Sequence, residues 1–164
     1  MSSDDTISIL PVSTTEDLTT IKHLFSAYAS SLPVDISYQN FSHELSSLPG
    51  NYSTSTGGAL LLARSSPTNN VLGCVGIRAL KPPTCCEMKR LYVCEPGRGL
   101  GVGKRLLMGA VKAARELGYK EVWLDTLPSM HAAIRMYRRL GFREIEPYYD
   151  TPVAGTIFLA LSLD

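Results

Sequence analysis

Hydrophobic and polar positions follow two different periods along the chain, and each period predicts one type of element. Alternation, or a short apolar run between turn residues, predicts strands, whereas apolar residues three and four apart predict helices. Strands are therefore predicted at 7–12, 59–64, 71–80, 85–93, 121–126, 142–145 and 156–163. Helices are predicted from a capping box at 13–17 to residue 31, then at 37–48, 100–117 and 128–140.

The order of these elements predicts a mixed α/β (α+β) fold. Strands 59–64, 71–80 and 85–93 follow one another through short turns, one of them around Pro82, and form an antiparallel meander. Strand 121–126 follows a helical crossover and should lie parallel to strand 85–93. We expect a central, mostly antiparallel sheet of seven strands flanked by four helices, in a single domain spanning 1–164.

Composition narrows the class of protein. The 164 residues carry a net charge of +1 and no basic run, which argues against a nucleic-acid partner. The polar start of the chain is unlike a signal peptide, and the apolar runs 59–63 and 157–161 are too short to span a membrane. We therefore expect a cytoplasmic protein without a membrane partner, as a monomer or homodimer.

The four cysteines, Cys74, Cys85, Cys86 and Cys94, form no C-x-x-C pair, and no histidine cluster accompanies them. Such an arrangement indicates reduced thiols and no metal site.

A glycine-rich run separates strand 85–93 from the helix that follows it. The backbone lacks Cβ atoms at Gly97, Gly99, Gly101 and Gly103. Positive charge comes from Arg98 and Lys104, and the other two residues of the run, Leu100 and Val102, are apolar. Free N–H groups and the dipole at a helix N-terminus favour an anion. The run therefore predicts a cradle for a pyrophosphate.

Three known cradles differ in spacing. A Walker A loop is excluded because Arg105 stands where Ser or Thr is required. Gly99, Gly101 and Gly103 are one residue short of the Rossmann fingerprint, although Asp125 sits where its ribose-binding acid would be, so a dinucleotide-dependent oxidoreductase stays open. The third pattern, Arg/Gln-x-x-Gly-x-Gly/Ala, matches residues 98–103.

With that third pattern and Ala133-Ile-Arg-Met-Tyr-Arg-Arg-Leu-Gly-Phe142, the chain resembles the GNAT superfamily of N-acetyltransferases. The resemblance covers nearly the whole chain and implies acetyl-CoA as co-substrate, with a splayed parallel strand pair in the sheet. The residues that it implies for binding acetyl-CoA are Leu91, Tyr92, Val93, Arg98, Gly99, Leu100, Gly101, Val102, Gly103 and Lys104. The chain departs from many relatives at Met130, where they carry an asparagine.

Acetyl transfer by direct attack of an amine requires a base, a group that protonates the leaving thiolate, and a donor to the carbonyl oxygen. The resemblance places Tyr137 at the coenzyme sulfur; a phenol with an ordinary pKa near ~10 keeps its proton at rest. Glu87 is the predicted base, and simple alternation would put it on one face with Lys89, Leu91 and Val93. Pairing of Glu87 with Lys89 or Arg90 is the alternative.

The same resemblance places the acceptor opposite the coenzyme. Candidate acceptor-binding residues are Phe41, Glu44, Tyr52, Arg78 and Tyr148. The near-neutral charge favours a small-molecule amine or an amino-acid-like acceptor over a basic protein tail. A non-catalytic acyl-CoA sensor of the same fold remains the alternative to an enzyme.

Overall fold

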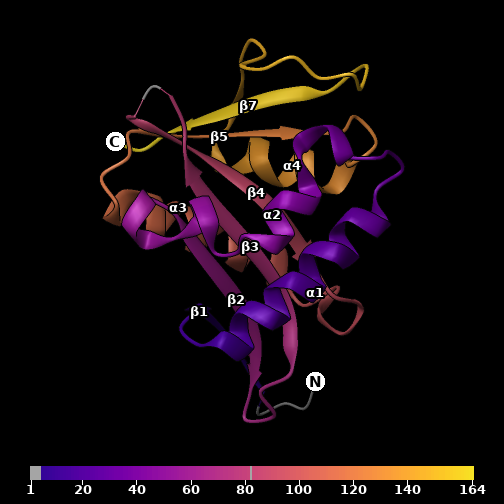
Figure 1. Ribbon diagram of the computed structural model, residues 1–164, viewed down its shortest axis with the longest axis vertical. Coiled ribbons are helices and arrows are strands. Elements are labelled where there is room, and N and C mark those ends of the chain that lie inside the picture. Colours follow the sequence, from indigo (N-terminus) through magenta and orange to yellow (C-terminus); the bar gives the residue numbers. More distant parts are fainter. Residues whose placement is uncertain (1–4, 82) are drawn as a thin grey trace.

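The computed structural model describes residues 5–81 and 83–164, and within them the chain forms one sheet of seven strands (Figure 1). The strands are β1 (Thr6–Pro11), β2 (Ala59–Ser66), β3 (Val71–Ala79), β4 (Cys85–Val93), β5 (Glu121–Thr126), β6 (Arg143–Glu144) and β7 (Ile157–Ser162). The helices are α1 (Thr15–Ser31), α2 (Phe41–Ser46), α3 (Val102–Glu116) and α4 (His131–Leu140). The turn predicted at Pro82 and the polar start at 1–4 lie outside the described residues.

The sheet has the spatial order β1-β2-β3-β4-β5-β7-β6, and the described strands pair antiparallel except for β4 and β5. This arrangement confirms the predicted fold class, the parallel pair and the order of the elements. Helix α3 is the crossover that connects the parallel strands β4 and β5 along the sequence.

Helices cover both faces of the sheet. In Figure 1, α1 and α2 lie in front of the strands and α4 lies behind β5. Each face has its own buried cluster: Ile21, Phe25 and Leu60 belong to the α1 side, and Leu106 and Val122 belong to the α3 side. The sheet thus separates two apolar layers, and anything that passes between β4 and β5 connects them.

Several element ends differ from the sequence-based expectation. The helix predicted at 37–48 is broken at Asn40, whose left-handed φ of 59° separates the 3-10 turn η1 (Ser37–Gln39) from α2. Gly101 is left-handed, with φ 75°, so α3 starts at 102 instead of 100. The last helix begins at His131, three residues later than predicted. The capping box is confirmed, since the Thr14 hydroxyl accepts the Asp17 amide over 3.0 Å.

A bulge in β4 changes the face on which its later side chains lie. Cys74 pairs with Tyr92 and Gly76 with Lys89, so β4 uses one residue more than β3 over this segment. Arg90 takes up the extra residue with a positive φ of 61°. The prediction that Leu91 and Val93 share a face of the sheet with Glu87 and Lys89 was therefore wrong. After the bulge, the side chains of Leu91 and Val93 pack against the buried cluster on the α3 side.

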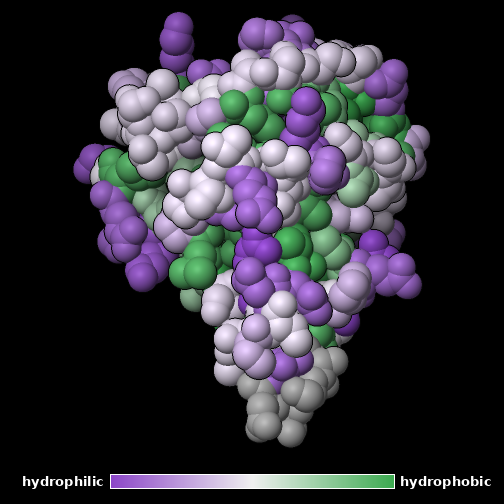
Figure 2. All heavy atoms as spheres, turned by 60° about the horizontal axis from the view of Figure 1, so that its bottom comes forward, coloured by the Kyte–Doolittle hydropathy of each residue, from purple (hydrophilic) through white to green (hydrophobic). Residues whose placement is uncertain are grey.

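Hydrophobic and hydrophilic side chains are interspersed over the face shown in Figure 2, so the apolar surface there is divided into separate areas. Among the described residues, no helix combines the length and the apolar character that crossing a membrane requires.

Candidate active site

The two parallel strands part after a short shared stretch. Among the described residues their register holds for three pairs, the last of which joins Glu87 to Trp123. Beyond this pair a pocket lies between β4 and β5, with walls that come from both faces of the sheet: Tyr137 and Met130 line it on the α4 side, and Tyr28 and Tyr38 line it on the α1 side. The pocket thus passes through the sheet.

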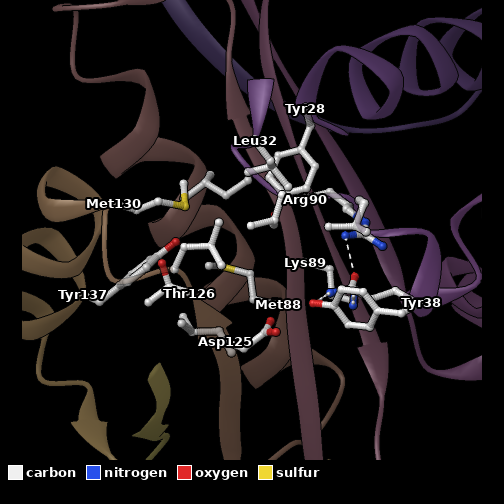
Figure 3. Close-up of a pocket in the computed structure, with 16 residues that line it drawn as sticks. Tyr28, Leu32, Tyr38, Met88, Lys89, Arg90, Asp125, Thr126, Met130 and Tyr137 are labelled. Atoms are coloured by element: carbon white, nitrogen blue, oxygen red, sulfur yellow. Dashed lines mark hydrogen bonds between the residues drawn. The ribbon is translucent and has the colours of Figure 1, made fainter. Parts of the chain in front are cut away.

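Tyr137 is held in the wall on the α4 side. It is 6% exposed, and its ring packs against Phe142, with 5.6 Å between the ring centroids. The chain reverses between these two residues at Gly141, whose φ of 108° closes α4. In Figure 3 the hydroxyl groups of Tyr137 and Thr126 lie near one another at the pocket. Burial, with smaller contributions from Tyr28 and Asp125, raises the pKa of Tyr137, so the phenol stays protonated.

The predicted phosphate cradle is open. Gly99 and Gly101 have φ values of 78° and 75°, and a Cβ atom built at either would meet nothing within 4 Å. The first bond into α3 runs from the Arg105 amide to the Gly101 carbonyl over 3.2 Å. The earlier amides of the helix have no acceptor inside it, and the exposed side chains of Arg98 and Lys104 stand beside them. These features fit a diphosphate.

The other predicted coenzyme residues lead from that cradle to the pocket. Gly103 faces Val93: a Cβ atom built at Gly103 would lie 3.6 Å from Val93 Cγ2. Leu91 lines the pocket itself. Tyr92 and Val93 pair with β3 on one edge, which leaves the other edge of β4 toward the splay. The segment 91–93 therefore has backbone groups directed at the gap.

Glu87, the predicted base, is 1% exposed and fully engaged. Arg78 Nε donates to Glu87 Oε1 over 3.0 Å, and Arg78 Nη2 lies 2.9 Å from the same oxygen. Tyr148 donates its hydroxyl to Glu87 Oε2, and Lys89 Nζ lies 3.8 Å from Oε1. The alternative pairing with Lys89 is thus present and the one with Arg90 is not, while in the described chain Glu87 does not line the pocket.

Glu44 is committed to Arg90. Nε and Nη2 of Arg90 each donate to a different oxygen of Glu44 over 2.9 Å, and the two side chains are 2% and 11% exposed. The guanidinium also lies between the rings of Tyr28 and Phe41, 5.5 Å and 5.1 Å from their centroids. Burial opposes ionisation of Glu44, but Arg90 outweighs it and lowers the pKa of the carboxyl. This pair fixes the bulge of β4 to α2.

The remaining predicted acceptor residues also bind protein groups. The ring of Tyr52 is 3% exposed and meets Phe25 edge-on at 5.6 Å. Tyr148 is stacked among Trp123, Tyr149 and Phe158. A second depression lies beside the pocket, and its lining includes Glu44, Tyr52 and Arg78. The predicted acceptor residues therefore gather on the expected face. Arg78 and Tyr148 are both bound to Glu87, Glu44 is bound to Arg90, and the buried hydroxyl of Tyr52 has no hydrogen-bond partner among the described residues.

Sequence reasoning missed most of the polar groups in the pocket wall, among them Lys89, Tyr38 and, except as a ribose ligand, Asp125. Lys89 is 7% exposed, and Asp125 accepts a hydrogen bond from the Tyr149 hydroxyl. A signal was present for Lys89, because a lysine in the middle of a central strand must find a buried partner or a cavity.

Comparison with known proteins agrees with this geometry. The model of the acetyltransferase (GNAT) family matches residues 21–142. The chain is 36% identical over 157 residues to an uncharacterized N-acetyltransferase of Schizosaccharomyces pombe, covering 96% of this chain and 95% of that protein. An uncharacterized N-acetyltransferase of Dictyostelium discoideum is 30% identical, with 90% of this chain and 95% of that protein covered.

Solved structures share the fold. A GNAT-family acetyltransferase of Staphylococcus aureus superposes with a TM-score of 0.77 at 22% identity, covering 97% of this chain and 100% of that one. A Salmonella typhimurium protein solved with its cofactor acetyl-CoA gives 0.72 at 18% identity, covering 96% and 94%. The chain belongs to the GNAT family of acetyltransferases. Its activity is acetyl-CoA-dependent N-acetyl transfer.

Replacing Glu44 with glutamine should lower the free energy of unfolding by about 3 kcal/mol, because it leaves the Arg90 guanidinium buried without its counter-charge. The lowered pKa of Glu44 means that this stabilisation is present above the ordinary glutamate pKa, about 4.3, and is lost as the pH falls through the folded-state value. Urea unfolding of both proteins between pH 7 and pH 3 measures the difference, which should shrink in acid.

Glu116→Gln is the matched control. Its carboxylate lies 3.9 Å from Lys112 Nζ in an exposed pair, so the change should stay below about 0.5 kcal/mol. Equal effects of the two substitutions would show that the buried pair does not hold the bulge.

Proposed function

We propose that this protein transfers an acetyl group from acetyl-CoA to the primary amine of a small-molecule or amino-acid-like acceptor, by direct attack in a ternary complex. The observation that carries the proposal is the pocket between β4 and β5, which has walls on both faces of the sheet. A thioester reaching it from the α4 side and an amine reaching it from the α1 side would meet between the strands. Direct transfer then needs no covalent enzyme intermediate.

The donor side is supported by the cradle at the start of α3. Main-chain amides of residues 99–104, assisted by Arg98 and Lys104, would hold the diphosphate, and the free edge of residues 91–93 would hold the pantetheine arm. A backbone amide in this segment is also the group best placed to donate to the carbonyl oxygen as it gains charge.

Tyr137 is the proposed acid. When the C–S bond breaks, the thiolate takes up a proton, and a buried phenol with a raised pKa retains its proton until that moment. Tyr137 lines the pocket on the α4 side, and the cradle lies on the same side, where Gly103 is close to Met136 of α4.

A small acceptor is favoured by how the α1 side is built. The carboxylates of Glu44 and Glu87 are engaged by arginines, which leaves Asp125, itself bonded to Tyr149, as the acidic group in the wall of this narrow pocket. Phe41, Tyr52, Arg78 and Tyr148 would then shape the entrance rather than bind the amine. A net charge of +1 offers no acidic field for a basic protein tail.

A panel assay tests the function. Purified protein with acetyl-CoA should release free thiol in the presence of small primary amines and amino acids, and much more slowly with lysine-rich peptides. Acetyl-CoA, but not NAD or NADP, should raise the melting temperature. Release of thiol with peptides alone would overturn the acceptor class, and a lack of stabilisation by acetyl-CoA would overturn the donor site.

Gly101→Ala should weaken acetyl-CoA binding about tenfold or more, because the new side chain occupies open space beside the proposed amide donors. A left-handed alanine also costs about 1–2 kcal/mol of stability. Gly118→Ala controls for that strain, since Gly118 has φ 87°, equally open surroundings and a place at the far end of α3. Calorimetric titration should separate the two variants; equal affinities would remove the cradle.

Tyr137→Phe should lower kcat by about 10²–10⁴ while leaving the dissociation constant of acetyl-CoA nearly unchanged, because only the proton donor is removed. Tyr119→Phe, which deletes a hydroxyl bonded to the Gly57 carbonyl, serves as the control and should keep kcat. Steady-state kinetics with the best amine of the panel decide the question. A wild-type kcat for Tyr137→Phe would assign protonation of the thiolate to solvent.

A further inference from the structure

A buried lysine lies in the wall of the pocket on the acceptor side. Lys89 is 7% exposed, and its Nζ donates to Gln39 Oε1 over 3.2 Å. Figure 3 shows Lys89 and Tyr38 across the pocket from Tyr137 and Thr126. An amine that enters from the α1 side would therefore reach Lys89 on its way to the thioester.

The two glutamates near Lys89 are bound at shorter distances by other residues than by Lys89 itself. Arg90 takes both oxygens of Glu44, and Arg78 takes one oxygen of Glu87 while Tyr148 takes the other. The distance of 3.8 Å from Lys89 Nζ to Glu87 exceeds a hydrogen bond. Of these three cations, only lysine can lose its proton, because a guanidinium stays charged in a protein.

The groups that face Lys89 come from every element packed around it. Burial lowers the pKa of Lys89; Glu87 opposes this, Arg90 and Arg78 add to it, and Asp125 on β5 opposes it. Tyr38 and Tyr28 also line the pocket wall, and burial raises the pKa of Tyr28, so that phenol stays neutral. The balance favours the uncharged amine of Lys89 far more than an exposed lysine would allow.

We propose that Lys89 is the general base of the reaction, accepting the proton of the acceptor amine on the α1 side of the pocket. This inference rests on the proposed acetyl transfer. The acceptor ammonium gives one proton to the Lys89 nitrogen; the freed lone pair attacks the thioester carbonyl carbon, and the C–S bond breaks. As the C–S bond breaks, the sulfur takes the proton of the Tyr137 phenol. The second N–H proton leaves as the amide forms and restores that phenol, and Lys89 releases the first proton to solvent.

In this assignment Glu87, the base expected from the sequence, is a positioning residue. Its carboxylate lies behind Lys89, fixed by Arg78 and Tyr148, and it stabilises the lysine once the proton has been taken up. The two assignments predict different variants to lose the ionisation that appears in the pH dependence of kcat: substitution of Lys89 in one case and of Glu87 in the other.

Two substitutions separate a base from a structural cation. Lys89→Met keeps the length and packing of the side chain, whereas Lys89→Arg keeps a permanent positive charge that cannot accept a proton. Both should lower kcat by about 10²–10⁴ with saturating acetyl-CoA and the best amine of the panel. As the pH increases, kcat of both variants should rise tenfold per pH unit and should not level off as the wild-type kcat does. Lys112→Met, at an exposed lysine on α3, should keep the wild-type profile.

A titration that needs no acceptor accompanies the kinetics. In protein carrying ¹³C at lysine Cε, one signal should titrate well below the other lysines and be absent from Lys89→Met. Binding of acetyl-CoA, followed by thermal shift, shows that each variant is folded.

Several results would overturn the assignment. They are a Lys89→Arg variant with wild-type turnover, a Lys89 signal that titrates with the surface lysines, or loss of the wild-type plateau in Glu87→Gln but not in Lys89→Met. Where a variant does not fold, the titration of the wild type decides. Absence of turnover with every amine would instead refute the proposed function. If Lys89 still titrated well below the other lysines, it would be a neutral lysine that does not act as a base in acetyl transfer.

Discussion

The site depends on the short length over which β4 and β5 pair. In the described chain three residue pairs hold the parallel strands together, and the bulge at Arg90 then bends β4 away from its neighbour. A left-handed arginine costs about 1–2 kcal/mol, and here a bidentate bond to Glu44 and two flanking rings offset that cost. A helix far away in the sequence thus sets the shape of the strand edge that faces the pocket.

The two sides of the pocket differ in kind as well as in position. On the α4 side the polar groups are hydroxyls, those of Tyr137 and Thr126, while the α1 side carries the ionisable side chains of Lys89 and Asp125. A proton donor kept neutral by burial and a group able to take a proton up are therefore separated by the space in which a carbonyl would react.

The local features of the fold could be predicted from the sequence. The bounds of β4 and β5 were predicted correctly, because apolar, β-branched and aromatic residues end there at clear turn signals. The break at Asn40 was missed, since apolar spacing continues across it and only the left-handed backbone interrupts the helix. The bulge was missed for a similar reason, as alternation carries no mark of an extra residue.

The polar pairing of the site could not be predicted, because it joins residues that are distant in the chain. Glu44 and Arg90 are 46 residues apart, and Tyr148 and Glu87 are 61 apart. Sequence reasoning assigned these acids to an amine because it could not know that arginines had already engaged them. Only three-dimensional contacts show which charged group remains available in the pocket.

What remains available also explains why a lysine occupies this position. A methionine would fill the same space between Gln39 and the pocket without burying an ionisable group, and such replacements are often neutral or stabilising. A lysine whose pKa is lowered by folding makes the native state bind fewer protons than the unfolded chain, so stability falls as the pH decreases through that range. The proposed role as a base gives a reason for a residue that weakens the fold in this way, because a lysine able to become neutral inside a through-sheet pocket is suited to activate an amine.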